Sequence, residues 1–327
     1  MTTRTDHMQP KTMAEKHGWP DNATALNVSN KKLKEYADHK FTPDMRPEAY
    51  RSKDGQDTGL LYLCDNLTVM QALPENFIDL IYMDPPFFTG KVRKAKSRIR
   101  ASEDSFEDTW TSDIEGYIEW LRPRLIETRR LLKSTGLIYL HLDWHAVHYV
   151  KVEMDRIFGY DRFINEIIWR YRTGGLSHNR FARKHDTILV YSKTSKFRIV
   201  PWKEKAYTKS RYRKAGVVNY GSGDAEFFSD SRGVYNIVNA SDVWEIPYIN
   251  SQAKERVGYP SQKPELLLER IIASSTRPGE MVADFFCGSG TTGVVAQRLG
   301  RRWILADKSR DAVEVSRLRL RERLSGY

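Results

Sequence analysis

The sequence predicts an α/β fold, in which a mixed, mostly parallel sheet carries helices on both faces. Residues 77–83 form an almost continuous apolar run, which is typical of a strand buried on both faces of a parallel sheet. Residues 281–299 read as a strand, a glycine turn and a helix that ends at Gly300. Strand-like and helical patterns alternate over much of the remaining chain, as α/β folds require.

We expect four segments along the chain: a polar N-terminal extension (1–58), a first half of the α/β body (59–192), an inserted region (193–256) and a second half of the body (257–327). The first half should contain strands and a long helix, at residues 77–83, 136–142, 187–191 and 114–132. Pro123 inside that helix predicts a kink or a restart. The inserted region breaks the alternation, because its aromatic and basic residues stand among short turns.

The composition indicates an intracellular protein that works on a polyanion. The chain has 53 Lys+Arg against 42 Asp+Glu, a formal charge of +11, which is typical of a phosphate binder. Its only cysteines, Cys64 and Cys287, indicate a reducing compartment without a disulfide framework. The sequence has neither a secretory start nor an apolar run long enough to cross a membrane. We therefore expect a cytoplasmic protein.

A carboxylate motif follows the first buried strand. Asp84-Pro85-Pro86-Phe87 begins directly after residues 77–83, at the strand end where open α/β sheets bind ligands. The prolines fix the backbone, so that the Asp84 carboxylate and the Pro85 carbonyl can each accept an N–H of a planar amine while Phe87 stacks on its ring. A plain turn after a strand is the alternative. The predicted catalytic residues are Asp84, Pro85, Pro86 and Phe87.

A glycine turn follows the second strand. Gly288 and Gly290 permit a tight turn after residues 281–285, and a helix begins just beyond them. The next apolar run ends at Asp307, about where an acid holds ribose hydroxyls in Rossmann-like folds. No Gly-Lys-Ser/Thr follows the glycines, which excludes a P-loop. The pattern favours a nucleotide-like cofactor, and a turn that only packs helix on strand is the alternative.

The two motifs together resemble the S-adenosylmethionine-dependent DNA amino-methyltransferases of the circularly permuted β group, in which an Asp-Pro-Pro-Tyr/Phe block precedes a Phe-x-Gly-x-Gly block. Residues 63–66, Leu-Cys-Asp-Asn, resemble the Gly-Asp-Cys element that contacts the cofactor adenine. Residues 259–264, Tyr-Pro-Ser-Gln-Lys-Pro, resemble the Pro-Thr-Gln-Lys-Pro element. The resemblance runs from about residue 60 to the C-terminus and implies a Rossmann-like methyltransferase fold. It implies S-adenosylmethionine as cofactor, held by Asp65, Asn66, Gln262, Lys263, Asp284, Phe286, Cys287, Gly288, Gly290, Thr291 and Asp307.

Within that group, residues 84–90 and 169–175 are most similar to the modification subunits of type III restriction systems and to related solitary enzymes. Two positions depart from the pattern. Leu63 stands where the family usually has glycine, and Phe285 replaces a proline, which would alter the shape of the cofactor loop. The implied partner is double-stranded DNA. The chain is shorter than a typical type III subunit, so a restriction subunit stays open, as does a homodimer.

The resemblance implies methylation of the N6 amino group of a flipped adenine. Methylation of cytosine N4 is the close alternative. Aspartate at the first position of the motif favours adenine only moderately, and N4 enzymes more often have serine there. Two further alternatives are an enzyme that methylates an amine in RNA or protein, and a DNA-binding module without activity. The permuted order and the basic insertion favour DNA, and intact Asp84, Phe87 and Asp284 favour activity. Cytosine C5 methylation is disfavoured, because it needs a thiolate that the motif lacks.

Basic residues follow the catalytic motif directly. Residues 91–100 predict a phosphate-gripping loop, with a solvated loop as the alternative; their cations are Lys91, Arg93, Lys94, Lys96, Arg98 and Arg100. In the permuted family, residues 193–256 hold the target recognition region. Candidates there for reading bases or for contacting phosphates are Arg211, Arg213, Asn219 and Arg232. Aromatic candidates for stacking, which are more often core anchors, are Tyr212, Tyr220 and Trp244.

A cluster of possible metal ligands lies after the strand at residues 136–142. It contains His141, Asp143, His145 and His148. The spacing mixes strand and helix periods, and the proposed chemistry needs no Lewis acid. We therefore expect no metal site, and expect His141 or Asp143 to line the cofactor or base pocket instead.

Overall fold

The structure is a computed structural model that describes residues 46–51, 55, 57–88, 92–96, 101–107, 113–172, 178–208, 215–219 and 224–325. By its internal contacts the chain divides into two units. The smaller unit contains Val200–Ala240, and the larger unit contains the described residues before and after it. Each unit is described by itself.

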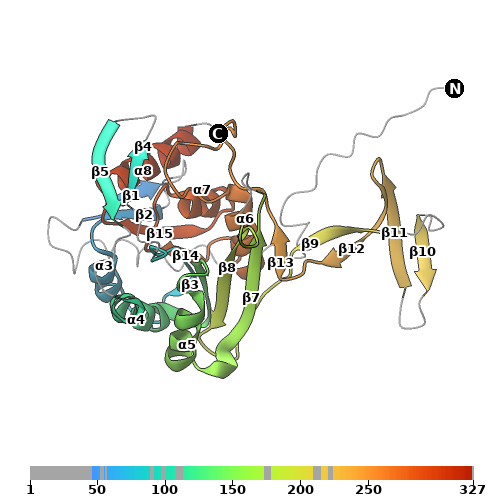
Figure 1. The fold of residues 1–327 in the computed structure, drawn as a ribbon, viewed down its shortest axis with the longest axis horizontal. Helices are drawn as coiled ribbons and strands as arrows, with labels where there is room; N and C mark the ends of the chain where they lie inside the picture. The colour runs from blue at the N-terminus through green and yellow to red at the C-terminus, as the bar shows by residue number, and fades with distance from the viewer. Residues whose placement is uncertain are drawn as a thin grey trace. The chain divides into compact units, whose positions relative to one another are not determined.

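The larger unit is built on a nine-stranded sheet (Figure 1). Its strands, in spatial order, are β1 (Glu48–Arg51), β2 (Asp57–Leu63), β15 (Arg302–Asp307), β14 (Met281–Asp284), β3 (Ile78–Met83), β6 (Leu132–Leu142), β8 (His185–Ser192), β7 (Phe163–Arg170) and β13 (Val243–Glu245). The five strands from β2 to β6 are parallel, while β1 and β8 run antiparallel to their neighbours. The predicted α/β class with a mixed, mostly parallel sheet is therefore confirmed.

Helices cover both faces of this sheet (Figure 1). One face carries α3 (Asn66–Ala72), α4 (Ile114–Leu131) and α5 (Val147–Phe158), which pack on one another in sequence. The other face carries α6 (Glu265–Ser275), α7 (Thr291–Arg298) and α8 (Arg310–Ser325). Each face has its own apolar core.

Strand β3 shows why the apolar run at residues 77–83 predicts a central strand. Ile81 and Met83 belong to the core under α3 to α5, whereas Leu80 and Tyr82 belong to the core under α6 to α8. Side chains alternate between the faces of a strand, so a strand that is covered on both sides is apolar at most positions. Asp79, the charged exception in β3, pairs with Lys133.

Helix α4 continues through Pro123 without a restart. Proline removes one backbone hydrogen bond and therefore weakens a helix interior. Leu121 and Leu125, on either side of Pro123, are fully buried in the core. Their burial anchors the turns on both sides of Pro123 in the core, which the sequence pattern alone does not reveal.

The bounds of the segments differ from the expected ones in two places. β1 lies within the expected extension 1–58 and forms an edge of the sheet, and β13 lies within the expected insertion 193–256 but pairs with β7. Both are strands of three or four residues, too short for an alternation pattern to identify. The separate unit, Val200–Ala240, is accordingly smaller than the predicted insertion.

The smaller unit is an antiparallel sheet of four strands in the order β10 (Gly216–Asn219), β11 (Asp224–Asp230), β12 (Gly233–Asn239) and β9 (Lys203–Tyr207). Its central hairpin pairs Asp230 with Gly233 across a tight turn. In addition, β4 (Val92–Lys96) and β5 (Ala101–Glu107) pair antiparallel with each other. Among the described residues, no helix combines the length and the apolar character needed to cross a bilayer.

Candidate active site

The two sequence motifs meet at one edge of the sheet. β14 and β3 are neighbouring parallel strands with Asp284 in register with Tyr82, so Asp284 and Asp84 end adjacent strands. From β14 the chain passes through α7 to β15 on one side, and from β3 through α4 to β6 on the other. The order of strands therefore diverges between β14 and β3. Open α/β sheets bind their ligands at such a switch point.

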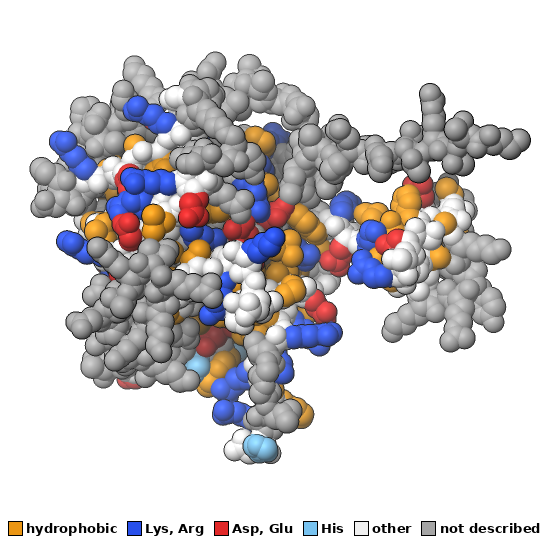
Figure 2. Space-filling view, turned by 90° about the horizontal axis from the view of Figure 1, so that it is seen from above, with side chains coloured by type: hydrophobic (Ala, Val, Ile, Leu, Met, Phe, Trp, Pro, Cys, Tyr) orange, Lys and Arg blue, Asp and Glu red, His pale blue; other side chains and the backbone are white. Residues whose placement is uncertain are grey.

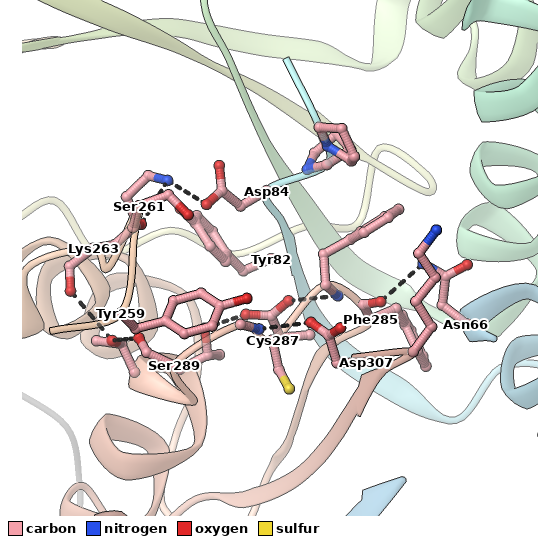
Figure 3. Close-up of a pocket in the computed structure, with 18 of the residues that line it drawn as sticks. Asn66, Tyr82, Asp84, Tyr259, Ser261, Lys263, Phe285, Cys287, Ser289 and Asp307 are labelled. Atoms are coloured by element: carbon pink, nitrogen blue, oxygen red, sulfur yellow. Dashed lines mark hydrogen bonds and ion pairs between the residues drawn. The ribbon is translucent and has the colours of Figure 1, made fainter. Parts of the chain in front are cut away.

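A cavity of about 280 Å³ lies at this edge (Figure 3). All four predicted catalytic residues line it: Asp84, Pro85, Pro86 and Phe87. Of the predicted cofactor residues, those that line it are Asp65, Asn66, Lys263, Asp284, Phe286, Cys287, Gly288, Thr291 and Asp307. One cavity therefore joins the amine side and the cofactor side of the predicted site.

Asp84 has two carboxylate oxygens in different states. Oδ2 accepts a hydrogen bond from Nζ of Lys263 in a largely buried ion pair (Figure 3). Oδ1 is buried and has no hydrogen-bond partner. The ammonium of Lys263 also lies 5.2 Å from the centroid of the Phe87 ring. Lys263, which the sequence predicts as a cofactor residue, thus contacts the catalytic motif.

A buried polar network lies behind Phe87. The Tyr82 hydroxyl is 2.7 Å from Nδ1 of His141, and Nε2 of His141 is 3.2 Å from Oδ2 of Asp186. Burial acts to raise the pKa of Asp186, but the hydrogen bond and the charge of His141, the charge of Lys263 and the hydrogen bond from Tyr171 outweigh it, so this pKa is lowered. Since the ionised carboxylate can only accept, we assign Nε2 of His141 as the donor to Asp186.

The cluster at residues 141–148 does not line the cavity. His141 takes part in the polar network, with its ring 5.7 Å from that of Phe87, and His145 pairs with Asp143 at 2.7 Å. Within the described ranges, no three His, Cys, Asp or Glu side chains are grouped so as to hold a metal ion. The expectation that His141 or Asp143 lines the pocket is therefore wrong, because neither residue is among those that line the cavity.

Two further carboxylates line the cavity, and each accepts a hydrogen bond at both of its oxygens. Asp284 accepts from the Phe286 N–H at 3.0 Å and from the Thr292 hydroxyl at 2.6 Å. Asp307 accepts from the N–H groups of Gly288 and Ser309, at 3.0 and 2.9 Å. Burial raises the pKa of Asp284 to about 7 and raises that of Asp307, while these hydrogen bonds act in the opposite direction.

The two glycines of the turn have different constraints. Gly288 has φ +49°, and a Cβ there would lie 3.2 Å from the Tyr259 ring, which also lines the cavity. Gly290 has φ +73°, and a Cβ there would lie 2.5 Å from the Ser316 hydroxyl on α8. Gly290 does not line the cavity. It allows close packing against α8 and does not make the predicted contact with the cofactor site.

The wall near α3 is held by Arg124, which the sequence does not single out. Its Nε donates to Oδ1 of Asn66 at 2.7 Å, and its NH2 donates to Oδ2 of Asp65 at 3.2 Å. Asn66 in turn donates to the Phe285 carbonyl at 3.0 Å, which ties this wall to the glycine turn. Arg124 also lies 4.2 Å from the Trp120 ring, and both residues line the cavity.

Gln262 does not line the cavity. It is buried, and its side chain bonds the backbone of Val257 and Glu255 at 3.0 and 2.6 Å. It therefore shapes the loop before Lys263 rather than facing a ligand. Sequence reasoning missed the further lining residues Tyr82, Trp120, Arg124 and Tyr259. Trp120 and Arg124 lie four positions apart on α4, which indicates a shared face but not which ligand that face meets.

The predicted DNA-binding residues are only partly described. Lys91, Arg98, Arg100, Arg211 and Arg213 lie outside the described residues, as do Tyr212 and Tyr220. Arg93, Lys94 and Lys96 lie in β4, so part of the expected loop is a strand. Asn219 ends β10, Arg232 lies 4.7 Å from the Tyr207 ring, and Trp244 is buried in the core. Figure 2 shows described Lys and Arg side chains spread among acidic ones rather than gathered in one block.

The shared cavity, the order of the two motifs and the sheet agree with the methyltransferase fold that the sequence resemblance implies. A family model described as a DNA methylase, N6_N4_Mtase, matches residues 78–317. The chain therefore belongs to the N6/N4 family of DNA methyltransferases.

Relatives support this membership. The chain is 29% identical over 271 residues to the type II methyltransferase M.HpaI of Haemophilus parainfluenzae, covering 81% of this chain and 75% of that protein. It is 25% identical over 277 residues to the DNA adenine methyltransferase YhdJ of Escherichia coli K12, covering 84% and 87%.

Solved structures show the same fold. The PvuII DNA methyltransferase, which is cytosine-N4-specific, has a TM-score of 0.55 at 19% identity, covering 85% of this chain and 95% of that one. The modification methylase TTHA0409 of Thermus thermophilus, solved with S-adenosyl-L-methionine, has a TM-score of 0.52 at 18% identity, covering 82% and 95%.

Proposed function

We propose that this protein transfers a methyl group from S-adenosylmethionine to the N6 amino group of an adenine in double-stranded DNA. The observation that carries the proposal is the state of Asp84. One of its oxygens is held by Lys263, and the other is buried without a partner in a cavity that Phe87 also lines. A buried acceptor without a donor costs about 1–3 kcal/mol. Such an arrangement is expected where a substrate N–H completes the hydrogen bond.

The residues around the cavity fit the cofactor. S-adenosylmethionine supplies an electrophilic methyl group on a positively charged sulfur. Gly288 leaves open a space that a Cβ would fill beside Tyr259. Asp307 retains lone pairs that can accept from ribose hydroxyls. Asp65 and Asn66 would form the wall beside the adenine of the cofactor, and Arg124 donates hydrogen bonds to both side chains.

On the amine side, Asp84 and Pro85 would draw on the two N–H bonds of the base. An exocyclic amine is a weak nucleophile because its lone pair is delocalised into the ring. Acceptors that hold both hydrogens favour a tetrahedral nitrogen with its lone pair free for the methyl group. Phe87 would stack on the base, and Lys263 would keep Asp84 oriented by its hydrogen bond to Oδ2.

Adenine is favoured over cytosine by two observations. The motif begins with aspartate at position 84, and the relative YhdJ is named as an adenine methyltransferase. The PvuII enzyme, named as cytosine-N4-specific, shares the fold at 19% identity, a likeness that bears on the fold alone. N4 methylation of cytosine is therefore the competing outcome of the test.

We assign the reading of the target sequence to residues 193–256, which contain Val200–Ala240 of the smaller unit. Their excess of basic residues and their place in the sequence, between the two halves of the methyltransferase body, support this assignment. The cations at residues 91–100 would contact phosphates.

Nucleoside analysis tests the proposed activity. Plasmid DNA from a host that lacks methyltransferases is incubated with the purified full-length protein and S-adenosylmethionine, digested to nucleosides and analysed by mass spectrometry. The expected product is N6-methyldeoxyadenosine. N4-methyldeoxycytidine would overturn the choice of base, and no methylated nucleoside would overturn the proposed activity. A reaction without protein is the control.

A further inference from the structure

The connection between β7 and β8 presents aromatic and basic side chains that the proposed function does not use. Its described part, residues 178–184, reads His-Asn-Arg-Phe-Ala-Arg-Lys and contains three cations and no acid. The Phe181 side chain is 99% exposed. Nearby, the guanidinium of Arg183 lies 3.4 Å from the ring centroid of Trp144, which is 44% exposed. We call residues 178–184 with Trp144 the 178–184 surface.

The strand register places this surface at the edge that carries the active site. β3 runs parallel to β6 with Met83 opposite Leu140, and β6 pairs with β8 with Leu142 opposite Thr187. The first residue of β8, His185, directly follows the surface and pairs with Arg170 at the end of β7. The connection therefore leaves the sheet at the same edge as Asp84, two strands and roughly 10 Å away.

Hydrogen bonds fix both ends of the connection beside the base pocket. The Tyr171 hydroxyl, just after β7, donates to Oδ1 of Asp186 at 2.9 Å. Asp186, near the start of β8, contacts Nε2 of His141 at 3.2 Å, and the His141 ring is 5.7 Å from the ring of Phe87. The connection thus begins and ends beside residues that are linked by hydrogen bonds to His141, next to Phe87.

The chemistry of this surface matches nucleic acid near an extruded base. A fully exposed phenylalanine gains nothing from folding, since its ring stays in water. Aromatic rings interleaved with arginine bind unstacked bases, because each base offers a face for stacking and each phosphate a negative charge. An enzyme that takes a base out of a duplex also leaves a gap in the stack, which an apolar side chain can fill.

We propose that the 178–184 surface contacts DNA beside the active site, with Arg180 and Arg183 on phosphates and Phe181 stacked in the gap left by the extruded base. This inference rests on the proposed function in one respect, that the substrate is a base within duplex DNA. It adds a contact that neither sequence motif contains.

Phe181→Ala tests the stacking contact, and Phe197→Ala is its matched control. Phe197 is also exposed, at 42%, and lies in the same unit. It follows the other end of β8, where Ser192 pairs with Leu137, so it lies at the opposite edge of the sheet. The recognition site is read by sequencing the methylated plasmid, and a duplex with that site carries 2-aminopurine at the target position.

We expect Phe181→Ala, but not Phe197→Ala, to weaken DNA binding and base extrusion. Phe181→Ala should weaken binding of this duplex by about 5- to 100-fold and reduce the rise in 2-aminopurine fluorescence. Phe181→Trp should restore both, whereas Phe197→Ala should match the wild type. Equal behaviour of Phe181→Ala and Phe197→Ala would overturn the stacking contact, while methylation of DNA by the wild type would still support the proposed function.

Salt dependence tests the phosphate contacts and needs no recognition site. The double variant Arg180→Gln/Arg183→Gln should flatten the log–log dependence of affinity on salt by about 2 units on a random duplex. Lys196→Gln, on an exposed residue beside Phe197, should leave the slope unchanged. An unchanged slope in the double variant would overturn the proposal. If light scattering shows that the wild type is a dimer and the double variant a monomer, and the salt slope is unchanged, the 178–184 surface is a contact between two copies of the chain. That outcome also overturns the proposal.

Discussion

Asp84 and Asp284 end neighbouring parallel strands and line one cavity, yet they have opposite hydrogen-bond states. Asp284 is 3% exposed, and its two oxygens accept from the Phe286 N–H and the Thr292 hydroxyl. Asp84 has a single partner, Lys263, and a buried oxygen with none. The hydrogen bonding of the Asp284 carboxylate is thus completed within the protein, whereas that of the Asp84 carboxylate is not.

This difference in hydrogen bonding indicates different roles for the carboxylates at the ends of the two strands. The hydrogen bonds of Asp284 fix the start of the glycine turn and of α7, so this carboxylate shapes the cofactor wall. An incomplete buried acceptor lowers stability and is expected where a ligand supplies the missing donor. We therefore propose that Asp284 has a positioning role and that Asp84 contacts the substrate.

Gly288→Val should have the largest effect on the cofactor side. Its side chain would meet the Tyr259 ring from a backbone with φ +49° and fill the space beside Asp307. We expect the affinity for S-adenosylmethionine to fall by about 10²-fold or more, with DNA binding retained, as measured by calorimetry and fluorescence anisotropy.

Gly300→Val is the control for backbone strain, because Gly300 has φ +71° but a Cβ there would meet only Pro278 at 3.8 Å. It should lower the melting temperature without changing the cofactor affinity. An unchanged affinity in Gly288→Val would show that the glycine turn does not face the cofactor.

Lys263→Met should separate orientation from binding on the Asp84 side. Without the ammonium, Asp84 loses its one hydrogen bond, and a misplaced catalytic group costs about 10- to 10²-fold in rate. Single-turnover methyl transfer at saturating cofactor and DNA should fall by this factor, while the dissociation constant for S-adenosylmethionine stays within a few fold. Lys263→Arg should recover much of the rate.

A second lysine pair on β3 provides the control for Lys263. Lys133 donates to Asp79 at 2.8 Å at the opposite end of the strand. Lys133→Met should lower the melting temperature without a specific loss of transfer rate. If Lys263→Met lowers the cofactor affinity and spares the transfer rate, Lys263 belongs to the cofactor wall, as the sequence alone suggests.

Asp284→Asn should have the smallest effect, on the pH dependence of stability. The folded-state pKa of Asp284 is about 7, above the ordinary value of 3.8, so the folded state holds this proton more tightly. Stability from this group is complete below about pH 4 and is lost as pH rises to about 7. Thermal melts between pH 5 and 8 should show a decline in the wild type that is weaker in Asp284→Asn, and parallel profiles would contradict the assignment.

The sequence predicted the fold and the meeting of the two motifs because both depend on local patterns. A continuous apolar run predicts a central strand such as β3, and the edge rule for parallel sheets then brings Asp84 and Asp284 together. Short edge strands were not predicted, because β1 and β13 hold too few residues to show an alternation.

The partners of the site residues could not be predicted, because they come from distant parts of the chain. Lys263 is 179 positions from Asp84, and Arg124 is 58 positions from Asn66. No periodicity links residues at such separations. The roles of Gln262 and Gly290 could not be predicted for the same reason, although both lie within cofactor motifs. The Gln262 side chain bonds the backbone of a loop. The missing side chain of Gly290 leaves room for Ser316 on α8.

Asp84→Ala tests the central claim most directly, because it removes the incomplete acceptor and leaves the Asp284 wall intact. Methyl transfer to DNA is measured in a single turnover, and cofactor affinity is measured on the same preparation. We predict a loss of transfer of about 10²-fold or more with an S-adenosylmethionine dissociation constant close to that of the wild type. Transfer at a near-normal rate in Asp84→Ala would contradict the account.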